Sequence, residues 1–541
     1  MNKQKRRILF GLAALFTLGG CNSFIEKIDD GPTVIVEKEG KPLSIVFSHN
    51  INGETHPCGC RHHPLGGLPQ VAGQIAKLQE SSNVIYVDSG DLFFPSSVLP
   101  KSIIKSKTFA ARNLAKGLSQ IGLKYVTPGD QDFALGFDFL KEMAKENKFE
   151  FLVANLRDES FPHKKWVKIK NGALTVYLTG FVEPKILENE IMSHFLPAST
   201  ALTAVFSEMK KDGLKENDPT TRLIVVSHAG IEYDEAMAKQ FPQIDWVIGA
   251  HSQSFLREPN VVGKTKMGQV LSRNHYLGEI RLEADPKKDG YEIHEMRDEV
   301  AKLLADNPYY GFIDSHKEKL QSLQIEEQNE QFAGATTVRK FEPASSCLDC
   351  HSDQHKFWQE TPHSVAFATL IKANEHFNTD CIKCHSVGLF DPRGYSKASE
   401  IVDFNDVSAD QVEAHRKAYW AEVNKAFKNT GSIREMKKDE LKKLSVTWQE
   451  TDKKYGVAHN FANVQCMNCH DVHSEHPFSS NPVKLTDKQR AEKIKSSCLN
   501  CHDPDQSPEW YDKDEKGLAR KLNEDRFQVH YKKVSCPTYS E

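Results

Sequence analysis

The sequence predicts an α/β domain in its first half, followed by a mainly α domain in its second half. Over residues 43–283, short apolar segments alternate with amphipathic ones, which is the rhythm of β-α-β units. Between Cys347 and His502 one pentapeptide, Cys-x-x-Cys-His, occurs four times, too closely spaced for a conventional hydrophobic core around each copy. Between the second and third copies, residues 412–427 and 441–448 carry apolar side chains at helical spacing.

The composition is that of an ordinary folded protein. Among 541 residues, 27% are charged and 39% are hydrophobic, which argues against wholesale disorder and against a multi-span membrane protein. The 70 basic and 74 acidic residues leave a formal net charge of −4. A balance this close to neutral gives no reason to expect a nucleic-acid partner.

The first 21 residues have the pattern of an export signal. Basic residues precede an apolar run over 8–18 that is too short to span a bilayer as a mature helix. The run ends in Leu-Gly-Gly-Cys21, which resembles a bacterial lipobox; the alternative is a simple signal peptide with a chance cysteine. In a lipobox Cys21 is diacylated, and two acyl chains anchor a protein stably. We therefore expect a periplasmic lipoprotein, attached to the inner or outer membrane through the polar tether 22–42.

Polar side chains follow several of the predicted strands of the α/β domain. The strands are expected at residues 43–48, 84–87, 151–154, 174–179, 223–227 and 246–249. The segments Asp88-Ser-Gly-Asp91, Ser227-His228 and Gly249-Ala-His251 stand directly after three of them. Ligands bind outside the carboxyl ends of strands in open α/β sheets, so a site is expected there.

These segments, in this order, resemble the metallophosphoesterase family, specifically its exported 5′-nucleotidase branch. The resemblance implies a four-layer αββα sandwich over residues 43–285. The remaining blocks that carry it are Ser48-His-Asn50-Ile-Asn52-Gly53, Gly66-Gly67-Leu68, Gly129-Asp130-Gln131-Asp132-Phe133, Ala154-Asn155-Leu156 and Gly249-Ala-His251-Ser-Gln253.

The resemblance also implies metal ligands, and only part of the set is kept. The family binds two divalent metals that share one Asp, which here is Asp91. One metal would be held by Asp91, Asp130, His228 and His251, a donor set that suits Zn, Mn or Fe. The other metal would rely on Asn50, Asn52 and Gln253, whose amides are weak ligands compared with carboxylate or imidazole. The catalytic His of the family falls at Gln131, so ordinary two-metal hydrolysis is not expected.

A thiol-containing loop follows the first block, with the sequence His56-Pro-Cys58-Gly-Cys60-Arg61-His62-His63. Imidazole and guanidinium groups beside a thiol lower its pKa and raise its reactivity. Cys58 and Cys60 are therefore candidates for redox or persulfide-carrying thiols, or for metal ligands. The alternative is that they form a strained local disulfide or are simply free.

The four pentapeptides are typical of c-type haem attachment, in which two thiols bond the porphyrin and the adjacent His binds the iron. One copy alone could be chance or half of a zinc site, but four copies that all keep the His predict four c-type haems. An export signal agrees, because such haems are attached outside the cytoplasm. The attachment residues would be Cys347, Cys350, Cys381, Cys384, Cys466, Cys469, Cys498 and Cys501, and the proximal ligands His351, His385, His470 and His502.

Residues 341–535 resemble the tetrahaem cytochrome c family typified by the electron acceptor of hydroxylamine oxidoreductase. The resemblance is carried by Thr361-Pro-His363-Ser, by the third pentapeptide with its continuation to His476, and by the fourth with Asp-Pro-Asp-Gln-Ser507-Pro508. It implies that His363 and His476 are distal ligands; His459 and His530 are the next candidates, with a packing or surface role as the alternative for each. Irons with two His ligands carry electrons, whereas an open iron, which the family can keep, binds small molecules.

The expected organisation is an export signal (1–21), a tether (22–42), a phosphoesterase-like domain (43–285), a connector (286–340) with a helix over 308–331, and a tetrahaem domain (341–541) in which the haems form the core. The favoured function is redox. The haems would exchange electrons with a periplasmic partner and with a centre built from the four metal ligands and the Cys58–Cys60 pair.

A small sulfur-containing substrate is a hypothesis, since thiols handle sulfane sulfur and one branch of the phosphoesterase family hydrolyses sulfur esters. One alternative is a pure electron carrier whose first domain is a relic scaffold. Another is a residual single-metal hydrolase.

Overall fold

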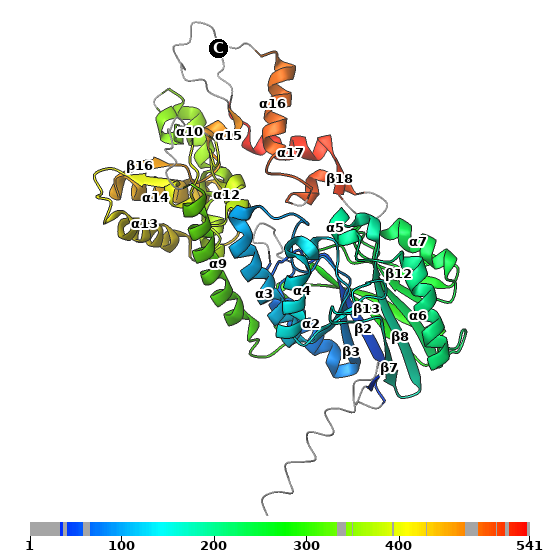
Figure 1. Cartoon of the computed structure of the whole chain (residues 1–541). Helices are drawn as coiled ribbons and strands as arrows, with labels where there is room; N and C mark the ends of the chain where they lie inside the picture. Colours follow the sequence, from blue (N-terminus) through cyan, green and yellow to red (C-terminus); the bar gives the residue numbers. More distant parts are fainter. Residues whose placement is uncertain are drawn as a thin grey trace, which may run out of the picture.

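The computed structural model describes residues 33–35, 40–57, 65–332, 342–348, 350–391, 394–428, 430–470, 485–504, 506–513 and 519–537. The export signal with Cys21, the thiols of Cys58 and Cys60, and His476 lie outside these residues. An α/β sandwich and a smaller helical part lie on either side of one long helix, α9 (Tyr309–Gln331), as Figure 1 shows.

Two seven-stranded sheets form the centre of the sandwich. The first has the order β1 (Thr33–Ile35), β7 (Trp166–Asn171), β8 (Leu174–Val182), β9 (Thr221–His228), β10 (Trp246–Ile248), β12 (Thr265–Gly268) and β11 (Asn260–Val262). The second has the order β14 (Gly290–Glu295), β13 (Tyr276–Leu282), β2 (Leu43–Ser48), β3 (Asn83–Asp88), β4 (Leu123–Val126), β5 (Glu150–Leu152) and β6 (His163–Lys164). Strands β2 to β6 are parallel to one another, as are β8, β9, β10 and β12.

Three apolar layers hold the sandwich together. Residues such as Phe47, Val87 and Ile224 fill the space between the sheets. Helices α6 (Ala198–Asp212) and α7 (Ile231–Gln240) cover the first sheet, and helices α2 (Leu68–Ser81), α3 (Ile104–Ile121) and α4 (Gly136–Glu146) cover the second. The four-layer αββα arrangement predicted from the sequence is thus confirmed.

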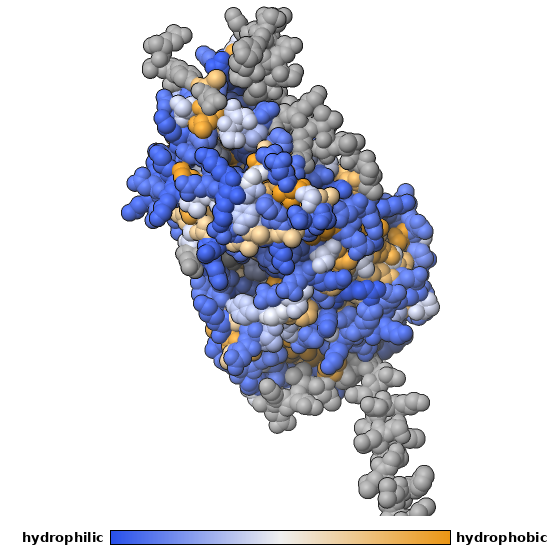
Figure 2. Space-filling model, turned by 90° about the vertical axis from the view of Figure 1, so that its left-hand side faces the viewer, coloured by the Kyte–Doolittle hydropathy of each residue, from blue (hydrophilic) through white to orange (hydrophobic). Residues whose placement is uncertain are grey.

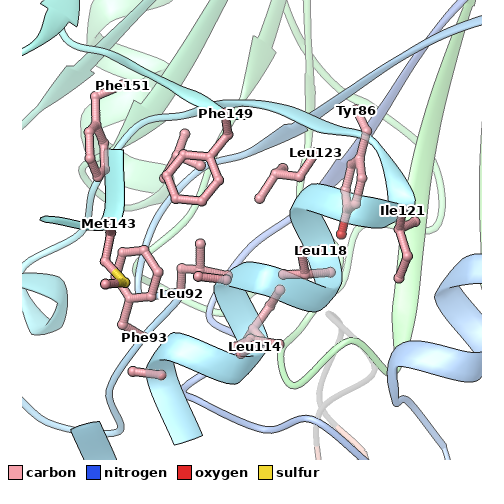
Figure 3. Packing of buried hydrophobic residues seen from close by; sticks show 14 of the residues in the cluster. Tyr86, Leu92, Phe93, Leu114, Leu118, Ile121, Leu123, Met143, Phe149 and Phe151 are labelled. Carbon is pink, nitrogen blue, oxygen red and sulfur yellow. The ribbon is translucent and has the colours of Figure 1, made fainter. Parts of the chain in front are cut away.

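The packing of α3 illustrates why these helices form. Leu114, Leu118 and Ile121 recur at intervals of four and three, so they lie on one face of the helix. That face points into the apolar layer between the second sheet and its helices (Figure 3). Leu114 and Leu118 are fully buried there, together with Phe149 and Phe151 from the neighbouring sheet. Burial of one such side chain stabilises the fold by about 1.5–3 kcal/mol.

The sandwich extends beyond the expected boundary at residue 285. β14 pairs with β13 along its length and brings the second sheet to Glu295. Helix α9, predicted over 308–331, is confirmed, and its Tyr309 and Ile313 belong to the same core as α3. The stretch assigned as a connector therefore packs onto the sandwich rather than running free of it.

The C-terminal part is mainly helical and has two apolar clusters among its described residues, one within 365–461 and a smaller one to which α16 and α17 contribute. Its helices are α10 (Ser352–Gln359), α11 (Ala368–Ala373), α12 (Thr379–His385), α13 (Val412–Phe427), α14 (Lys438–Lys454), α15 (Cys466–Cys469), α16 (Asp487–Leu499) and α17 (Glu524–Val534). Two small antiparallel two-stranded sheets, β15 (Val402–Phe404) with β16 (Val457–Asn460) and β17 (Tyr511–Lys513) with β18 (Ala519–Leu522), complete it. The helices predicted over 412–427 and 441–448 are confirmed as α13 and part of α14.

The surface seen in Figure 2 is largely hydrophilic, with small scattered hydrophobic areas. Within the described residues, no helix combines the length and the apolar character that a membrane crossing requires.

Candidate metal centre and haem-binding region

Four predicted metal ligands meet at one edge of the two sheets. Asp91 comes three residues after β3, Asp130 opens a 3₁₀ helix (Gln131–Leu135) after β4, and His228 and His251 follow β9 and β10. One ligand atom from each of these side chains lies within 4.8 Å of every other. The Nε2 atom of His228 is 3.2 Å from Asp130 Oδ1 and 3.4 Å from Asp91 Oδ2, and His251 Nδ1 is 3.1 Å from Asp130 Oδ1.

The backbone around this cluster is held in uncommon conformations. Asp91 and His251 have φ angles of 57° and 68°, in the left-handed region that side chains usually avoid. Gly129 allows a close approach, because a Cβ atom there would lie 2.2 Å from Asp91 Oδ1 and 2.5 Å from the ring of His228. Strain of this kind persists where the surrounding structure fixes it, and it gathers at functional sites.

His228 is oriented for a metal. Its Nδ1 donates a hydrogen bond to the carbonyl of Ser89 at 2.6 Å, so Nε2 is the nitrogen that faces the two carboxylates. Metal-binding imidazoles are commonly oriented by such a bond. Burial opposes a charge on His228, but Asp91 and Asp130 outweigh it and raise its pKa well above the ordinary value. Burial likewise opposes ionisation of Asp130, yet hydrogen bonds from His228 and His251 lower its pKa.

A divalent transition metal fits this donor set. The site offers two carboxylates and two imidazoles, and Asp91 and His228 are fully buried. A divalent cation bound here would offset the charge of the two carboxylates, Asp91 and Asp130. His251 is the most exposed member, with 37% of its side chain accessible, and opens the cluster toward solvent.

The residues at the second metal position behave differently. Asn50 is buried and donates from Nδ2 to Asp91 Oδ2 at 2.7 Å. Gln131, at the position of the family's catalytic His, donates its backbone N–H to Asp91 Oδ1 at 3.0 Å. Asn52 and Gln253 lie beside the centre with φ angles of 60° and 49°. Two of these residues thus make their hydrogen bonds to the shared carboxylate.

The Cys-x-x-Cys-His repeats come together in two pairs. The thiol of Cys347 in the first repeat contacts that of Cys466 in the third, and Cys384 in the second contacts Cys501 in the fourth. Among the described cysteines no disulfide is formed. Pairing of this kind favours haems that lie close together.

One predicted distal ligand lies opposite a predicted proximal ligand. The rings of His363 and His502 have centroids 6.3 Å apart. Burial lowers the pKa of His363 to about 4 and that of His502 to about 3, with neighbouring His residues adding to the effect. Both imidazoles are therefore neutral, the form that binds metals. This arrangement fits an iron held between two imidazoles.

The other distal candidates are placed less directly. His530 stacks on Trp510, which in turn stacks on His502. His459 lies in β16 against Phe461, and within the described residues its Nδ1 has no hydrogen-bond partner. Their roles as iron ligands stay predictions, as does that of His476.

A half-buried pair of side chains, His56 and Glu375, joins the two halves of the molecule. His56 Nε2 lies 2.7 Å from Glu375 Oε1, and Lys317 of α9 lies 3.4 Å from the same oxygen. Burial opposes ionisation of Glu375, but the hydrogen bond to His56 and the charge of Lys317 lower its pKa to about 2. His56 stands two residues before Cys58, and Glu375 stands six residues before Cys381. The sequence alone gave no signal for this contact.

Comparisons with known proteins give different matches for the two halves of the chain. The family model described as "Cytochrome c554 and c-prime" matches residues 346–412. A 5′-nucleotidase-related protein from Glossina morsitans morsitans is 28% identical over 241 residues, which are 40% of each chain. Human 5′-nucleotidase is 22% identical over 262 residues, which are 42% of this chain and 43% of that protein. The chain thus spans about two fifths of the length of these curated relatives.

Among solved structures, a 5′-nucleotidase precursor from Thermus thermophilus is 17% identical with a TM-score of 0.42, over 55% of this chain and 60% of the other. The sulfate thiohydrolase SoxB from the same organism is 14% identical with a TM-score of 0.41, over 57% and 63%. On the sequence comparisons, the first half is similar to 5′-nucleotidases and related metallophosphoesterases, and a segment similar to cytochrome c554 follows it in the same chain.

Proposed function

We propose that this protein is a periplasmic, lipid-anchored multihaem cytochrome c that exchanges electrons between four haems and a single-metal centre in its phosphoesterase-like domain. The observation that carries the proposal is the ion pair between His56 and Glu375. It ties the segment that leads into the Cys58–Cys60 pair to the segment that leads into the second haem-attachment repeat. The contact supports a working connection between the loop region and the haem region.

The side chains present at the metal centre support a redox or binding role rather than hydrolysis. The cluster keeps its two carboxylates and two imidazoles, whereas the position of the catalytic His is Gln131, which cannot protonate a leaving group. When bound, the haem irons supply single-electron transfer and the metal supplies Lewis acidity. The chain's own part is to orient His228 through Ser89 and to hold Asp91 through backbone and amide donors.

A small thiol or other reduced sulfur compound is the substrate class that suits the Cys58–Cys60 pair. Joining two thiols in a disulfide breaks two S–H bonds, forms one S–S bond and releases two protons and two electrons. Two ferric haems becoming ferrous would take up those electrons, so the step balances without a further oxidant.

The test is stopped-flow absorbance of the haems after mixing with sulfur donors. The Cys58→Ser/Cys60→Ser variant should show haem reduction slowed by at least about tenfold, whereas Cys536→Ser, a single exposed cysteine, should behave as the wild type. Dithionite should reduce all three proteins equally, which verifies that the haems are intact. Equal reduction by sulfur donors in all three would remove the thiols from the mechanism.

Metal analysis separates this proposal from a pure electron carrier. About one non-haem transition metal for every four haem irons supports a working centre. Absence of such a metal from protein purified without chelators favours a carrier whose first domain serves only as a scaffold.

The anchor is proposed from the lipobox and has its own test. Replacement of Cys21 by Ser should move the protein from the membrane fraction to the soluble periplasmic fraction, because the two acyl chains would be missing. A Cys21→Ser variant that stays with the membrane would contradict the lipid anchor.

A further inference from the structure

Beside Asp91, a chain of hydrogen bonds occupies the place where a two-metal phosphoesterase holds its second cation. The chain begins at the backbone N–H of Val270, which donates to His49 Nε2 at 2.8 Å. A nitrogen that accepts a hydrogen bond carries no proton, so the proton of the neutral His49 ring is on Nδ1. That Nδ1 lies 2.8 Å from Asn50 Oδ1 and donates to it.

The orientation of the Asn50 amide follows from this donor. Its oxygen accepts from His49, which leaves the NH₂ group to face Asp91 Oδ2 at 2.7 Å. Turning the amide over would set two donors against each other at His49 and two acceptors against each other at Asp91. His49, Asn50 and Asp91 are all buried, so water cannot relieve either clash.

We propose that this His49–Asn50–Asp91 relay has replaced the second cation, so that the centre binds one divalent transition metal and excludes another. An N–H group directed at a carboxylate supplies the positive end of a dipole where the second metal would otherwise sit. The inference rests on the metal centre of the proposed function and specifies how many ions that centre takes.

The lone pairs of Asp91 support the same count. Oδ1 accepts the backbone N–H of Gln131, and Oδ2 accepts Asn50 while lying 3.4 Å from His228 Nε2. Each carboxylate oxygen of Asp91 thus accepts one N–H donor, and Oδ2 is also the oxygen that faces His228 and a metal on that side.

The remaining residues at the second position do not compensate. Asn52 Oδ1 is buried and has no hydrogen-bond partner within the described residues, and Gln253 is half-buried. Both are neutral amides. Among the described residues, the group of side chains that could hold a metal adds no further carboxylate or imidazole at this position. A second divalent ion would thus find two weak amide ligands, and the NH₂ group of Asn50 would occupy its place beside Asp91.

Manganese stoichiometry tests the inference. Full-length, haem-loaded protein is stripped with a chelator, equilibrated with excess Mn²⁺ and passed over a desalting column. Manganese and iron are then measured in one digest, and the spectroscopically determined haem content gives the chain concentration. We expect one Mn²⁺ per chain in the wild type and a six-line electron paramagnetic resonance signal from an isolated ion.

Restoring the ligands should restore the second ion. The Asn50→Asp/Asn52→His/Gln253→His variant should bind two Mn²⁺ per chain, and magnetic coupling through Asp91 should diminish the six-line signal. The control Asn147→Asp adds a carboxylate at the end of α4, away from the centre, and should bind one. Should the triple variant fail to fold, the wild-type count decides by itself.

Two Mn²⁺ per wild-type chain, falling to one in Asn50→Ala, would overturn the inference and leave the proposed electron transfer standing. Equal haem reduction with and without the Cys58–Cys60 thiols would count against the proposed function and leave the single-ion count standing.

Discussion

His56 and Glu375 are 319 positions apart in the chain, yet their side chains meet at 2.7 Å. Thr55 Oγ1 lies 3.0 Å from the other ring nitrogen of His56, and Asn378 donates to the second oxygen of Glu375 at 3.2 Å. Each partner of the pair is therefore held by its own domain. The contact determines how the thiol-bearing loop stands relative to the second haem-attachment repeat.

Removing the carboxylate should weaken this junction. Glu375→Gln puts a neutral amide where His56 and Lys317 now face a carboxylate, and we expect a loss of about 1–3 kcal/mol in the free energy of unfolding. The matched control is Glu330→Gln, which breaks an exposed ion pair with Lys105 and should change the free energy of unfolding much less. Thermal unfolding followed by circular dichroism measures both. Equal effects in the two variants would show that the His56–Glu375 pair contributes no more than a surface pair.

Acid should destabilise the same region through His316. Burial and the adjacent His56 lower the pKa of His316 from 6.5 to about 4, although Glu375 opposes the shift. The unfolded chain therefore binds more protons than the folded chain between these two pH values. The stabilisation is fully present above pH 6.5 and is lost as the pH falls toward 4.

His316→Gln should remove this dependence. Relative to the variant, the wild type should lose on the order of 2–3 kcal/mol of unfolding free energy over that interval. Chemical denaturation at a series of pH values gives both curves. Parallel curves would mean that His316 does not titrate differently in the folded state.

Metal binding should depend on His228. Loss of a group that only orients a ligand commonly weakens binding by about 10–100-fold, so His228→Ala should exceed that range. The control His294→Ala alters a different group of His and Glu side chains, on β13 and β14, and should leave the affinity of the centre unchanged. Competition with a chelator of known affinity provides the measurement, and unchanged binding in His228→Ala would place the metal elsewhere.

Carbon monoxide should report on His363. If His363 and His502 share an iron, His363→Ala opens one coordination position, and the reduced protein should bind one more CO per chain than the wild type. His415→Ala is the control, because its Nε2 is engaged by the carbonyl of Tyr455. CO difference spectra give the count. A wild-type count in His363→Ala would assign His363 a packing role.

The elements with strong local periodicity could be predicted from the sequence. β2, α9 and α13 lie where their patterns predicted them, and β2, an almost wholly apolar run, is buried at every position. β13 and β14 gave no comparable signal: β13 takes its place by pairing with β2, whose residues lie more than 200 positions earlier in the chain. The β5 strand also ends at Leu152, earlier than predicted, since Val153 and Ala154 donate to Lys164 and Gly180 instead.

The four metal ligands were predictable from the sequence as one set. The order of the blocks gave Asp91, Asp130, His228 and His251, and the structure brings these four side chains together. The role of Asn50 was not predictable, because the orientation of its amide depends on Val270, whose N–H reaches His49 across 221 positions. Contacts of that range arise from the fold and leave no local pattern.

Helix α9 contacts both halves of the molecule and so fixes how one is rotated relative to the other. Glu327 accepts the backbone N–H of Ser106 in the sandwich, whereas Gln328, the next residue, bonds the backbone of Phe377 and Ala398 in the helical part. Each added residue turns a helix by about 100° and lengthens it by about 1.5 Å. One residue inserted before Glu327 would therefore rotate Glu327 and Gln328 relative to the sandwich. Glu327 would then no longer face Ser106 while Gln328 faces Phe377 and Ala398. Seven inserted residues would nearly keep the phase but add about 10 Å. The length and the rotation of α9 must therefore both fit its contacts with the sandwich and with the helical part.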